Sequence, residues 1–386
     1  MLISSSGIFG IVILALFFAG MFYDISFDGQ WYHQESVLQL STNWNPVKAN
    51  LEVPEAERGY SGDNDWCTGR DDQIQNLHPF KNTSPNLKYV AINHFPKGIE
   101  NAEASIYKIS KHIETAKAVN GILLAATFFL SLSFLYGFTG IRAWQKWVMA
   151  LIISFNPIAV TQLLSFCVDG SLACSLTCLV LTCCLLFRQV NKIHLWLMSS
   201  LILIMVNIKF TSLVFTCIIV SGLLTAQLIY QKKEDFKKVL LVSMLAGLIG
   251  VACCGFHPYL TNLINEGDVF YGLKDTSGEI RRNTPAAFLT LNRIEKLFLS
   301  LSSHTVDRLE NNSARSIPKI PFSFNKNDIK NVNDAEVLLS GFGPFFSGAL
   351  IFAFVIFVIC LARSGKTAAF RQLFCLLMIL CATILI

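Results

Sequence analysis

The sequence predicts an all-α membrane protein, a polytopic bundle of about nine transmembrane helices. Three observations predict this class. The 386 residues are 53% hydrophobic and only 15% charged, with a mean hydropathy of +0.50, whereas soluble domains carry about 25% charged residues. Long apolar runs recur along the chain, most of them close to the length that crosses a bilayer. Short loops rich in Lys and Arg alternate with them, as expected of loops on the cytoplasmic side.

The first expected span covers residues 1–23. Its apolar run from Ile8 to Phe22 lacks the basic start of a signal peptide, and no A-x-A cleavage site follows it. We therefore expect the segment to be retained as a membrane helix. Residues 24–114 follow as a long polar loop outside the membrane.

Two amphipathic helices are expected in this loop. The first should lie on the membrane surface with Ser26 as its N-cap, because one stripe has the helical period: Phe27, Trp31, Gln34 and Leu38. Its opposite, polar face holds Asp28, Tyr32, Glu35 and Gln39. The second should run straight into the next span, and its stripe holds Ala102, Ile106, Ile109, Ile113 and Ala116. Residues 43–96, rich in Asn, Asp, Pro and Gly, predict a loop.

Residues 115–256 predict a transmembrane bundle of about six spans, expected near 118–138, 147–166, 170–187, 194–208, 210–230 and 239–256. The stretch 194–230 holds a single charge, Lys209. Read as one helix it would measure about 55 Å, far beyond the roughly 30 Å hydrocarbon core. We therefore expect two spans, with Lys209 at the turn between them.

A second extracytoplasmic loop, 257–340, and C-terminal transmembrane helices, 341–386, complete the expected layout. The chain stops at Ile386 inside an apolar run, so we expect it to be truncated, with further spans beyond. In this layout all the basic loops fall on the cytoplasmic side, namely 139–147, 188–193, 231–238 and 363–372. Both long polar loops then lie on the opposite face.

The cysteines predict no disulfide framework. Of 12 Cys, all but Cys67 lie within or beside apolar segments, where Cys behaves as a small hydrophobe. The chain has no HExxH motif and no CxxC pair, so no metal site is predicted, although a divalent cation is left open as a cofactor. The net charge of +5 reflects the basic cytoplasmic loops and predicts no nucleic-acid partner.

Side chains able to carry chemistry gather on the extracytoplasmic side. Directly after the first span, the stretch Asp24–His33 places two carboxylates, an imidazole and the neighbouring aromatic rings of Trp31 and Tyr32. Candidates from distant segments join them on the same face, namely His94, Asp169, Lys209, His257, Arg281 and Arg282. The cytoplasmic side offers only short basic loops, so we expect any chemistry to face outward.

This layout resembles the GT-C superfamily of membrane glycosyltransferases, whose first outward loop opens on an acidic motif after the first span. The resemblance is carried by the Asp24–His33 stretch, the first-loop helices, Asp169 and the stretch that begins His257-Pro-Tyr. Short stretches around Asn93-His94, Asn207-Ile-Lys209 and Gly341-Phe-Gly look similar to uncharacterised bacterial members. The resemblance implies an enzyme of the bacterial inner membrane whose active site faces the periplasm or exterior.

The resemblance also implies a polyprenyl-phosphate sugar donor, contact with membrane lipid, and a glycan, lipid or protein acceptor. Deprotonating the acceptor hydroxyl requires a base, and we assign this role to Asp28. A helix N-terminal carboxylate that offsets the macrodipole is the alternative interpretation of Asp28. Asp24 either assists this base or only marks the end of the first span. Asp169, which is costly to place in a membrane core, is the third catalytic candidate, with a cap at the end of a span as the alternative.

The departing lipid phosphate requires cations. Lys209, Arg281 and Arg282 are the candidates, with snorkelling of Lys209 or a solvated Arg pair as the alternatives. His33, His94 and His257 are candidates for contacting substrate, His33 and His94 by orienting the acceptor or binding a metal, with histidines of no special role as the alternative. Tyr32 is expected to stack on a sugar ring, or else to anchor the chain at the interface.

Three other functions stay open. A transporter or flippase would have broken helices, and Pro157 inside an expected span is one such break. An O-antigen polymerase or ligase would use the second extracytoplasmic loop, 257–340. That function would not explain the acidic residues after the first span. A structural membrane protein would carry no chemistry at all.

Overall fold

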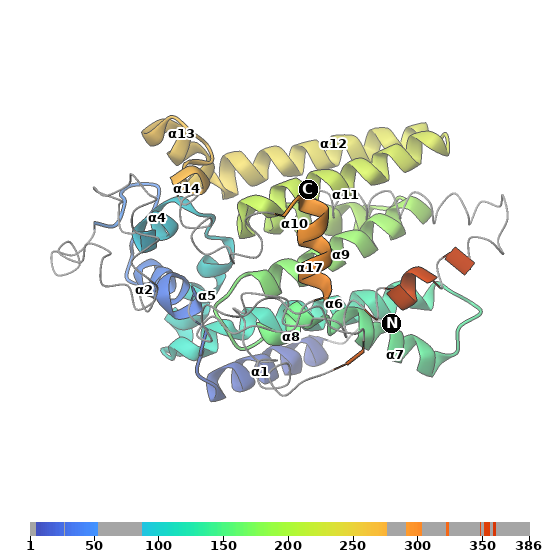
Figure 1. The fold of residues 1–386 in the computed structure, drawn as a ribbon, viewed down its shortest axis with the longest axis horizontal. Coiled ribbons are helices and arrows are strands. Elements are labelled where there is room, and N and C mark those ends of the chain that lie inside the picture. Colours follow the sequence, from blue (N-terminus) through green and yellow to red (C-terminus); the bar gives the residue numbers. More distant parts are fainter. Residues whose placement is uncertain are drawn as a thin grey trace.

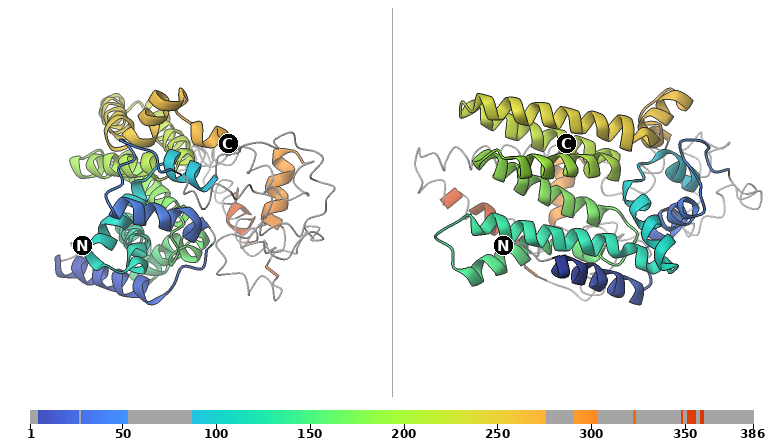
Figure 2. Two further views of the ribbon diagram at one scale, coloured as in Figure 1. Left: turned by 90° about the vertical axis from the view of Figure 1, so that its left-hand side faces the viewer. Right: turned by 180° about the vertical axis from the view of Figure 1, so that it is seen from behind.

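The computed structural model describes residues 5–26, 28–52, 87–275 and 291–302, and short pieces at 322–323, 348, 351–355 and 358–359. Every regular element among these described residues is a helix. Long helices lie side by side along the longest axis of the molecule, and short helices gather at one end of them (Figure 1). We call this end the cap, comprising residues 23–52, 87–117 and 255–275. Figure 2 shows the cap from the end and from behind.

The bundle is built from helices that are apolar over most of their length: α1 (Ser5–Met21), α6 (Ala118–Tyr136), α7 (Ala143–Ser154), α9 (Asp169–Arg188), α10 (Lys192–Ile208), α11 (Phe210–Ile229) and α12 (Lys233–Ile249). Within the described residues, four stretches are long and apolar enough to cross a membrane: Ile113–Tyr136, Asp169–Arg188, Phe210–Ile229 and Lys233–Cys254. The helical, membrane-type fold is thereby confirmed. A total of about nine spans is not confirmed, and the spans expected after residue 340 fall largely outside the described residues.

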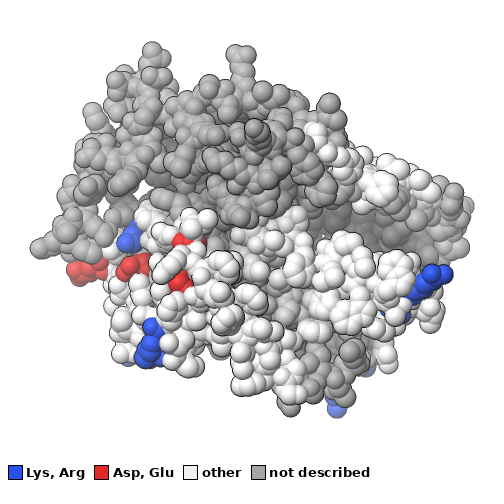
Figure 3. Space-filling view, turned by 90° about the horizontal axis from the view of Figure 1, so that it is seen from below, with Lys and Arg blue, Asp and Glu red and all other residues white. Residues whose placement is uncertain are grey.

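The main apolar core of the bundle lies between α9, α10, α11 and α12. Leu179, Leu186 and Met198 are fully buried there. On the outside, α12 exposes Met244 and Leu248. Among the described residues visible in Figure 3, charged side chains lie mainly toward the two ends of the molecule, and the residues between them carry no Lys, Arg, Asp or Glu side chains on this face. An apolar outer band between charged ends is the arrangement that a bilayer requires.

Helices α10 and α11 meet at Lys209. The Lys209 backbone is extended, with φ −158° and ψ 150°, and this interrupts the helical hydrogen-bond pattern. The Ser212 N–H donates to the Lys209 carbonyl at 3.0 Å and closes the first turn of α11. The expected pair of helices on either side of Lys209 is confirmed, and a single helix over 194–230 is excluded.

The continuous helix expected at 147–166 is wrong. Helix α7 ends at Ser154, and α8 (Pro157–Thr161) begins after Asn156, whose side chain accepts a hydrogen bond from the Ala159 N–H at 3.0 Å. Proline has no amide hydrogen and clashes with the preceding turn, so it starts a helix readily but does not continue one. Residues 162–168 then form a turn-rich loop that leads to α9.

The cap contains short helices from three parts of the chain: η1 (Gly29–His33), α2 (Gln34–Ser41), α4 (Leu87–His94), α5 (Gly98–Ser110), η3 (Ile113–Lys117), η5 (Phe256–Leu260), α13 (Thr261–Glu266) and α14 (Tyr271–Asp275). Segment η4 (Gly250–Cys254) extends α12 toward the cap, and α17 (Arg293–Ser302) follows later in the chain. Segment η1 is a single π-helical turn, a feature that often marks functional sites.

The first loop differs from the expected arrangement in three places. Residues 87–94, expected as loop, form α4. Helix α5 does not run into the next span, because Lys111 has a left-handed backbone with φ 57° and ends it. Ser26 does not cap the following helix, since its hydroxyl donates to Asp24 and Asp28 takes the N-cap position.

The helix after the first span turns a third face, in neither predicted stripe, into the interior of the cap. Segments η1 and α2 bury Gly29, His33, Ser36 and Val37, which lie between the two predicted stripes. Val37 packs against Ala104 of α5 inside the cap. A polar partner inside the cap, described next, decides this orientation in place of the apolar period.

Candidate active site in the cap

A small cavity lies where the cap meets the end of the helical bundle. Its volume is about 40 Å³, enough for a few water molecules or the tip of a polar group. Tyr32, His33, Glu100 and Lys209 line it, and the other lining residues are mostly apolar: Phe95, Pro96, Val168, Ile208, Phe210, Thr211 and Leu273. The cavity thus unites η1, α5, the α10–α11 junction and α14.

His33 and Glu100 form a buried pair on the wall of this cavity. The His33 Nδ1 lies 2.9 Å from the Glu100 Oε1, and the two side chains are 6% and 1% exposed. Segment η1 ends on His33, and the first turn of α5 supplies Glu100. A carboxylate that accepts the hydrogen of Nδ1 leaves the imidazole lone pair on Nε2.

Lys97 supports the negative charge of Glu100. Its Nζ lies 3.7 Å from the same Glu100 Oε1, and its side chain is 2% exposed. Burial raises the pKa of Glu100, but the charge of Lys97 and the hydrogen bond with His33 outweigh burial, so the pKa falls below its ordinary value. Burial in turn lowers the pKa of Lys97, and Glu100 opposes that effect. Each group therefore favours the charged form of the other.

Glu103, one turn further along α5, is a buried carboxyl group of a different kind. It is fully buried, and neither of its carboxyl oxygens has a hydrogen-bond partner among the described residues. Burial and the negative charges of Glu100 and Asp24 raise its pKa well above the ordinary value, against the opposing charge of Lys117. The interior of the cap therefore favours the neutral acid at this position.

Lys209 and Asp169 form an ion pair at the edge of the site. The Lys209 Nζ donates to the Asp169 Oδ1 at 2.8 Å, and the side chains are 40% and 44% exposed. Such a half-exposed pair contributes at most about 1 kcal/mol to stability. Its position matters more than its strength, because it holds a cation on the cavity wall within reach of water.

Tyr32 and Asp28 lie one turn apart at the start of η1. Burial and the charge of Asp28 raise the pKa of Tyr32 well above its ordinary value, so its phenol keeps its proton. The Tyr32 and His33 rings stack with centroids 4.1 Å apart. Asp28 is half-buried at the N-cap position and is not one of the residues that line the cavity.

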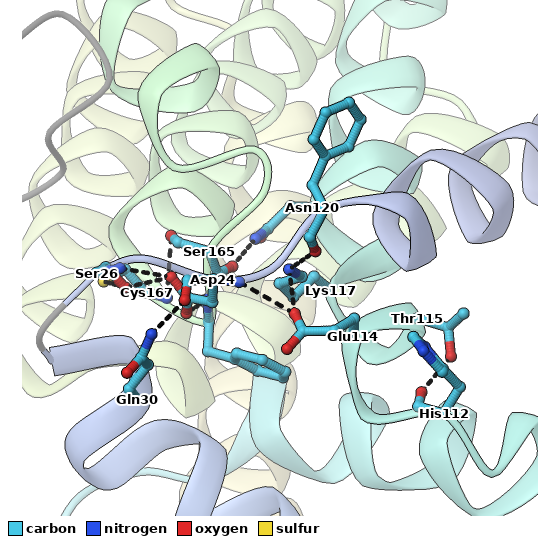
Figure 4. Close-up of polar contacts among 12 residues, drawn as sticks. Asp24, Ser26, Gln30, His112, Glu114, Thr115, Lys117, Asn120, Ser165 and Cys167 are labelled. Carbon is cyan, nitrogen blue, oxygen red and sulfur yellow. Dashed lines mark hydrogen bonds and ion pairs between the residues drawn. The ribbon is translucent and has the colours of Figure 1, made fainter.

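Asp24 is fixed by hydrogen bonds on both carboxylate oxygens (Figure 4). Its Oδ1 accepts from the Ser26 N–H at 2.8 Å and the Ser26 hydroxyl at 2.7 Å, and its Oδ2 accepts from the Phe166 N–H at 2.7 Å. Its own N–H donates to Glu114, which forms an ion pair with the buried Lys117. Asp24 is only 3% exposed, so its surroundings are those of a structural group.

His94 and His257 connect cap helices and do not line the cavity. The His94 Nδ1 lies 2.9 Å from the Asn262 Oδ1, and its ring packs edge-on against Tyr271. The His257 Nδ1 lies 3.0 Å from the Thr261 hydroxyl. Burial, together with the nearby Lys97 and His94, lowers the pKa of His257 to about 3, so this imidazole is neutral.

The structure thus brings together part of the set expected from the sequence. Tyr32, His33 and Lys209 share one cavity, and Asp169 holds Lys209. Arg281 and Arg282 lie outside the described residues. The sequence reasoning missed Glu100 and Glu103 and assigned no role to Lys97. Their spacing of three residues, which places charged groups on one face of a helix, is a signal that could have identified them.

Comparisons of the chain with protein-family models, with curated proteins and with solved structures find no match. Within the residues that the structure describes, no group of three or more His, Cys, Asp or Glu side chains is arranged to hold a metal ion. The chemistry of the site is therefore inferred from its own residues.

Proposed function

We propose that this chain is a membrane glycosyltransferase that moves a sugar from a polyprenyl-phosphate-linked donor to an extracytoplasmic acceptor. One observation carries the proposal: a single cavity at the outer end of the bundle joins the His33–Glu100 pair to Lys209. Sugar transfer needs a base for the acceptor hydroxyl and a cation for the departing phosphate. This end of the bundle is also where a lipid-borne donor would meet water. A bacterial inner membrane, with this end facing the periplasm or exterior, is part of the proposal.

In this proposal Lys209 receives the phosphate. Its side chain is half-exposed, and Asp169 keeps the ammonium group at the cavity wall, so we assign Asp169 an orienting role. Arg281 and Arg282 are proposed as further phosphate contacts. The base comes from the turn that follows α1, where Asp28 and His33 are the two groups able to take a proton. Asp24, His94 and His257 are assigned structural roles, and the need for a divalent cation is left open.

The test is transfer of radiolabelled sugar from polyprenyl-phosphate donors in membranes that contain the full chain. Lys209→Met keeps the length of the side chain and removes its charge, so we expect at least a tenfold loss of transfer, which corresponds to about 1.4 kcal/mol of transition-state stabilisation. Lys209→Arg should retain more activity than Lys209→Met. Lys192→Met, at the exposed opposite end of α10, is the matched control and should behave as wild type.

Two outcomes would overturn the proposal. Wild-type membranes that transfer sugar from no donor, with the protein correctly inserted, would favour a carrier or a polymerase. Full activity of Lys209→Met would show that the phosphate is bound elsewhere.

A further inference from the structure

One nitrogen of the His33 ring is hydrogen-bonded to Glu100, and the other is available to a molecule bound in the cavity. Nδ1 lies 2.9 Å from the Glu100 Oε1, and this is the one hydrogen bond that the described residues give the His33 side chain. The ring is held from the side by stacking on Tyr32. Because His33 lines the cavity, the ring atom able to meet a bound hydroxyl is Nε2.

Glu100 has the surroundings expected of a carboxylate that orients the His33 imidazole. It is fully buried, and Lys97 at 3.7 Å favours its ionised form. A buried carboxylate that accepts from Nδ1 fixes the tautomer and the orientation of an imidazole, and it stabilises the imidazolium formed when Nε2 takes a proton. The positive charge that develops on the His33 ring is thus stabilised by the Glu100 carboxylate, which is already in place.

We propose that His33 is the proton acceptor of the site and that Glu100 is its positioning residue. This inference rests on the proposed function and deepens it. The acceptor oxygen forms a bond to the anomeric carbon of the sugar while its hydroxyl proton passes to Nε2 of His33. The bond between the anomeric carbon and the phosphate oxygen breaks, and the lipid phosphate leaves with the electron pair toward Lys209. The imidazolium later returns its proton to water.

The alternative base, Asp28, is placed less well for this step. It occupies the start of η1, is half-buried and does not line the cavity. Its charge acts on Tyr32, where it helps to keep the phenol protonated. The structure therefore favours the imidazole at the end of the turn over the carboxylate at its beginning.

The first test measures transfer kinetics in the full chain. We expect His33→Gln to lower kcat by about 10²-fold or more, the usual contribution of a general base, with little change in KM. Glu100→Gln should lower kcat in the same way, and Glu100→Asp should recover part of the loss. The fold-decrease in kcat caused by Asp28→Asn should be at least ten times smaller than the fold-decrease caused by His33→Gln. His112→Gln, an exposed imidazole of the cap, is the matched control and should match wild type.

The second test does not depend on transfer. In membranes labelled with ¹⁵N-histidine, the nitrogen shifts should show that His33 carries its hydrogen on Nδ1, with the signal assigned by its loss in His33→Gln. Glu100→Gln should change this tautomer equilibrium, which a purely packing role of Glu100 would leave unchanged. A hydrogen on Nε2 in wild type, or a tautomer indifferent to Glu100→Gln, overturns the inference.

The two tests separate the inference from the proposed function. If wild type transfers sugar and His33→Gln retains the full rate, the function stands and the role of His33 fails. If wild type transfers nothing, the proposed function and the catalytic role of His33 fail together, while the nitrogen shifts still report whether Glu100 orients the ring.

Discussion

The carboxylate of Asp24 and the backbone amide of Phe166 are joined by a hydrogen bond of 2.7 Å, although 142 positions separate them in the chain. This bond ties the segment after α1 to the loop before α9. The same segment leads to Tyr32 and His33, and the same loop leads to Asp169. The distance across the candidate site therefore depends on a carboxylate that does not itself line the cavity.

Asp24→Asn should destabilise the protein. The amide has one acceptor oxygen in place of two, and it turns an N–H₂ toward either the Phe166 N–H or the Ser26 donors. Hydrogen bonds to a charged group contribute about 1.5–3 kcal/mol each, so the midpoint of thermal unfolding in detergent should fall clearly. Asp28→Asn is the matched control, and equal midpoints for the two variants would contradict the structural role of Asp24.

Glu103→Gln should make stability less dependent on pH. The folded-state pKa of Glu103 is raised above its ordinary value of 4.5, so the folded protein keeps a proton that the unfolded chain releases as pH rises above that value. Wild type should therefore lose stability with rising pH across the window between the two pKa values, by about 1.4 kcal/mol per pH unit. The measurement is the difference in unfolding free energy between wild type and variant along a pH series. A constant difference would show that Glu103 ionises normally.

For His257 the pH dependence of stability has the opposite sign, and His257→Gln should remove a loss of stability at low pH. The pKa of His257 is lowered from 6.5 to about 3 in the folded protein, so the unfolded chain takes up a proton first as pH falls. Wild type should lose the corresponding stability between these two values, while at neutral pH this contribution is fully present. Comparing acid unfolding of wild type and His257→Gln isolates the effect. The same acid midpoint in both proteins would mean that the imidazole is solvated.

Gly98→Ala should separate α5 from the end of α10. A Cβ atom at Gly98 would lie 2.6 Å from the Asn207 carbonyl oxygen and 2.8 Å from its Cβ, and backbone cannot move aside as a flexible side chain can. Overpacking of this kind costs about 1–3 kcal/mol. Because α5 carries Glu100 and Asn207 lies two positions before Lys209, we expect transfer to fall along with the unfolding midpoint. Gly247→Ala, where a Cβ meets no atom within 4 Å, is the control.

The helical bundle could be predicted because membrane spans are set by length and hydropathy, which are local properties of the sequence. The break at Lys209 followed from the same reasoning, since a helix of that length would overshoot the bilayer. The interruption at Asn156 and Pro157 was visible as a motif. Its effect on the expected span was missed because the apolar run continues across it.

The polar interior of the cap could not be predicted in the same way. The apolar stripe of α5 includes Ile106 and Ile109, yet in the folded protein Ile109 is 85% exposed and Glu103 is fully buried. Glu100 faces inward because His33 and Lys97 compensate its charge there. A partner 67 positions away leaves no trace in the local period, so hydropathy could not identify the buried face.

These long-range pairs also set an order for biogenesis. The cap is closed by contacts that span 67, 142 and 168 positions, the last between His94 and Asn262. A chain that emerges from the ribosome with its N-terminus first cannot form the last of them until the α13 segment has been made. Closing such long loops is intrinsically slow. Completion of the cap is therefore a late step in the folding of residues 23–275, because its last contact needs the α13 segment.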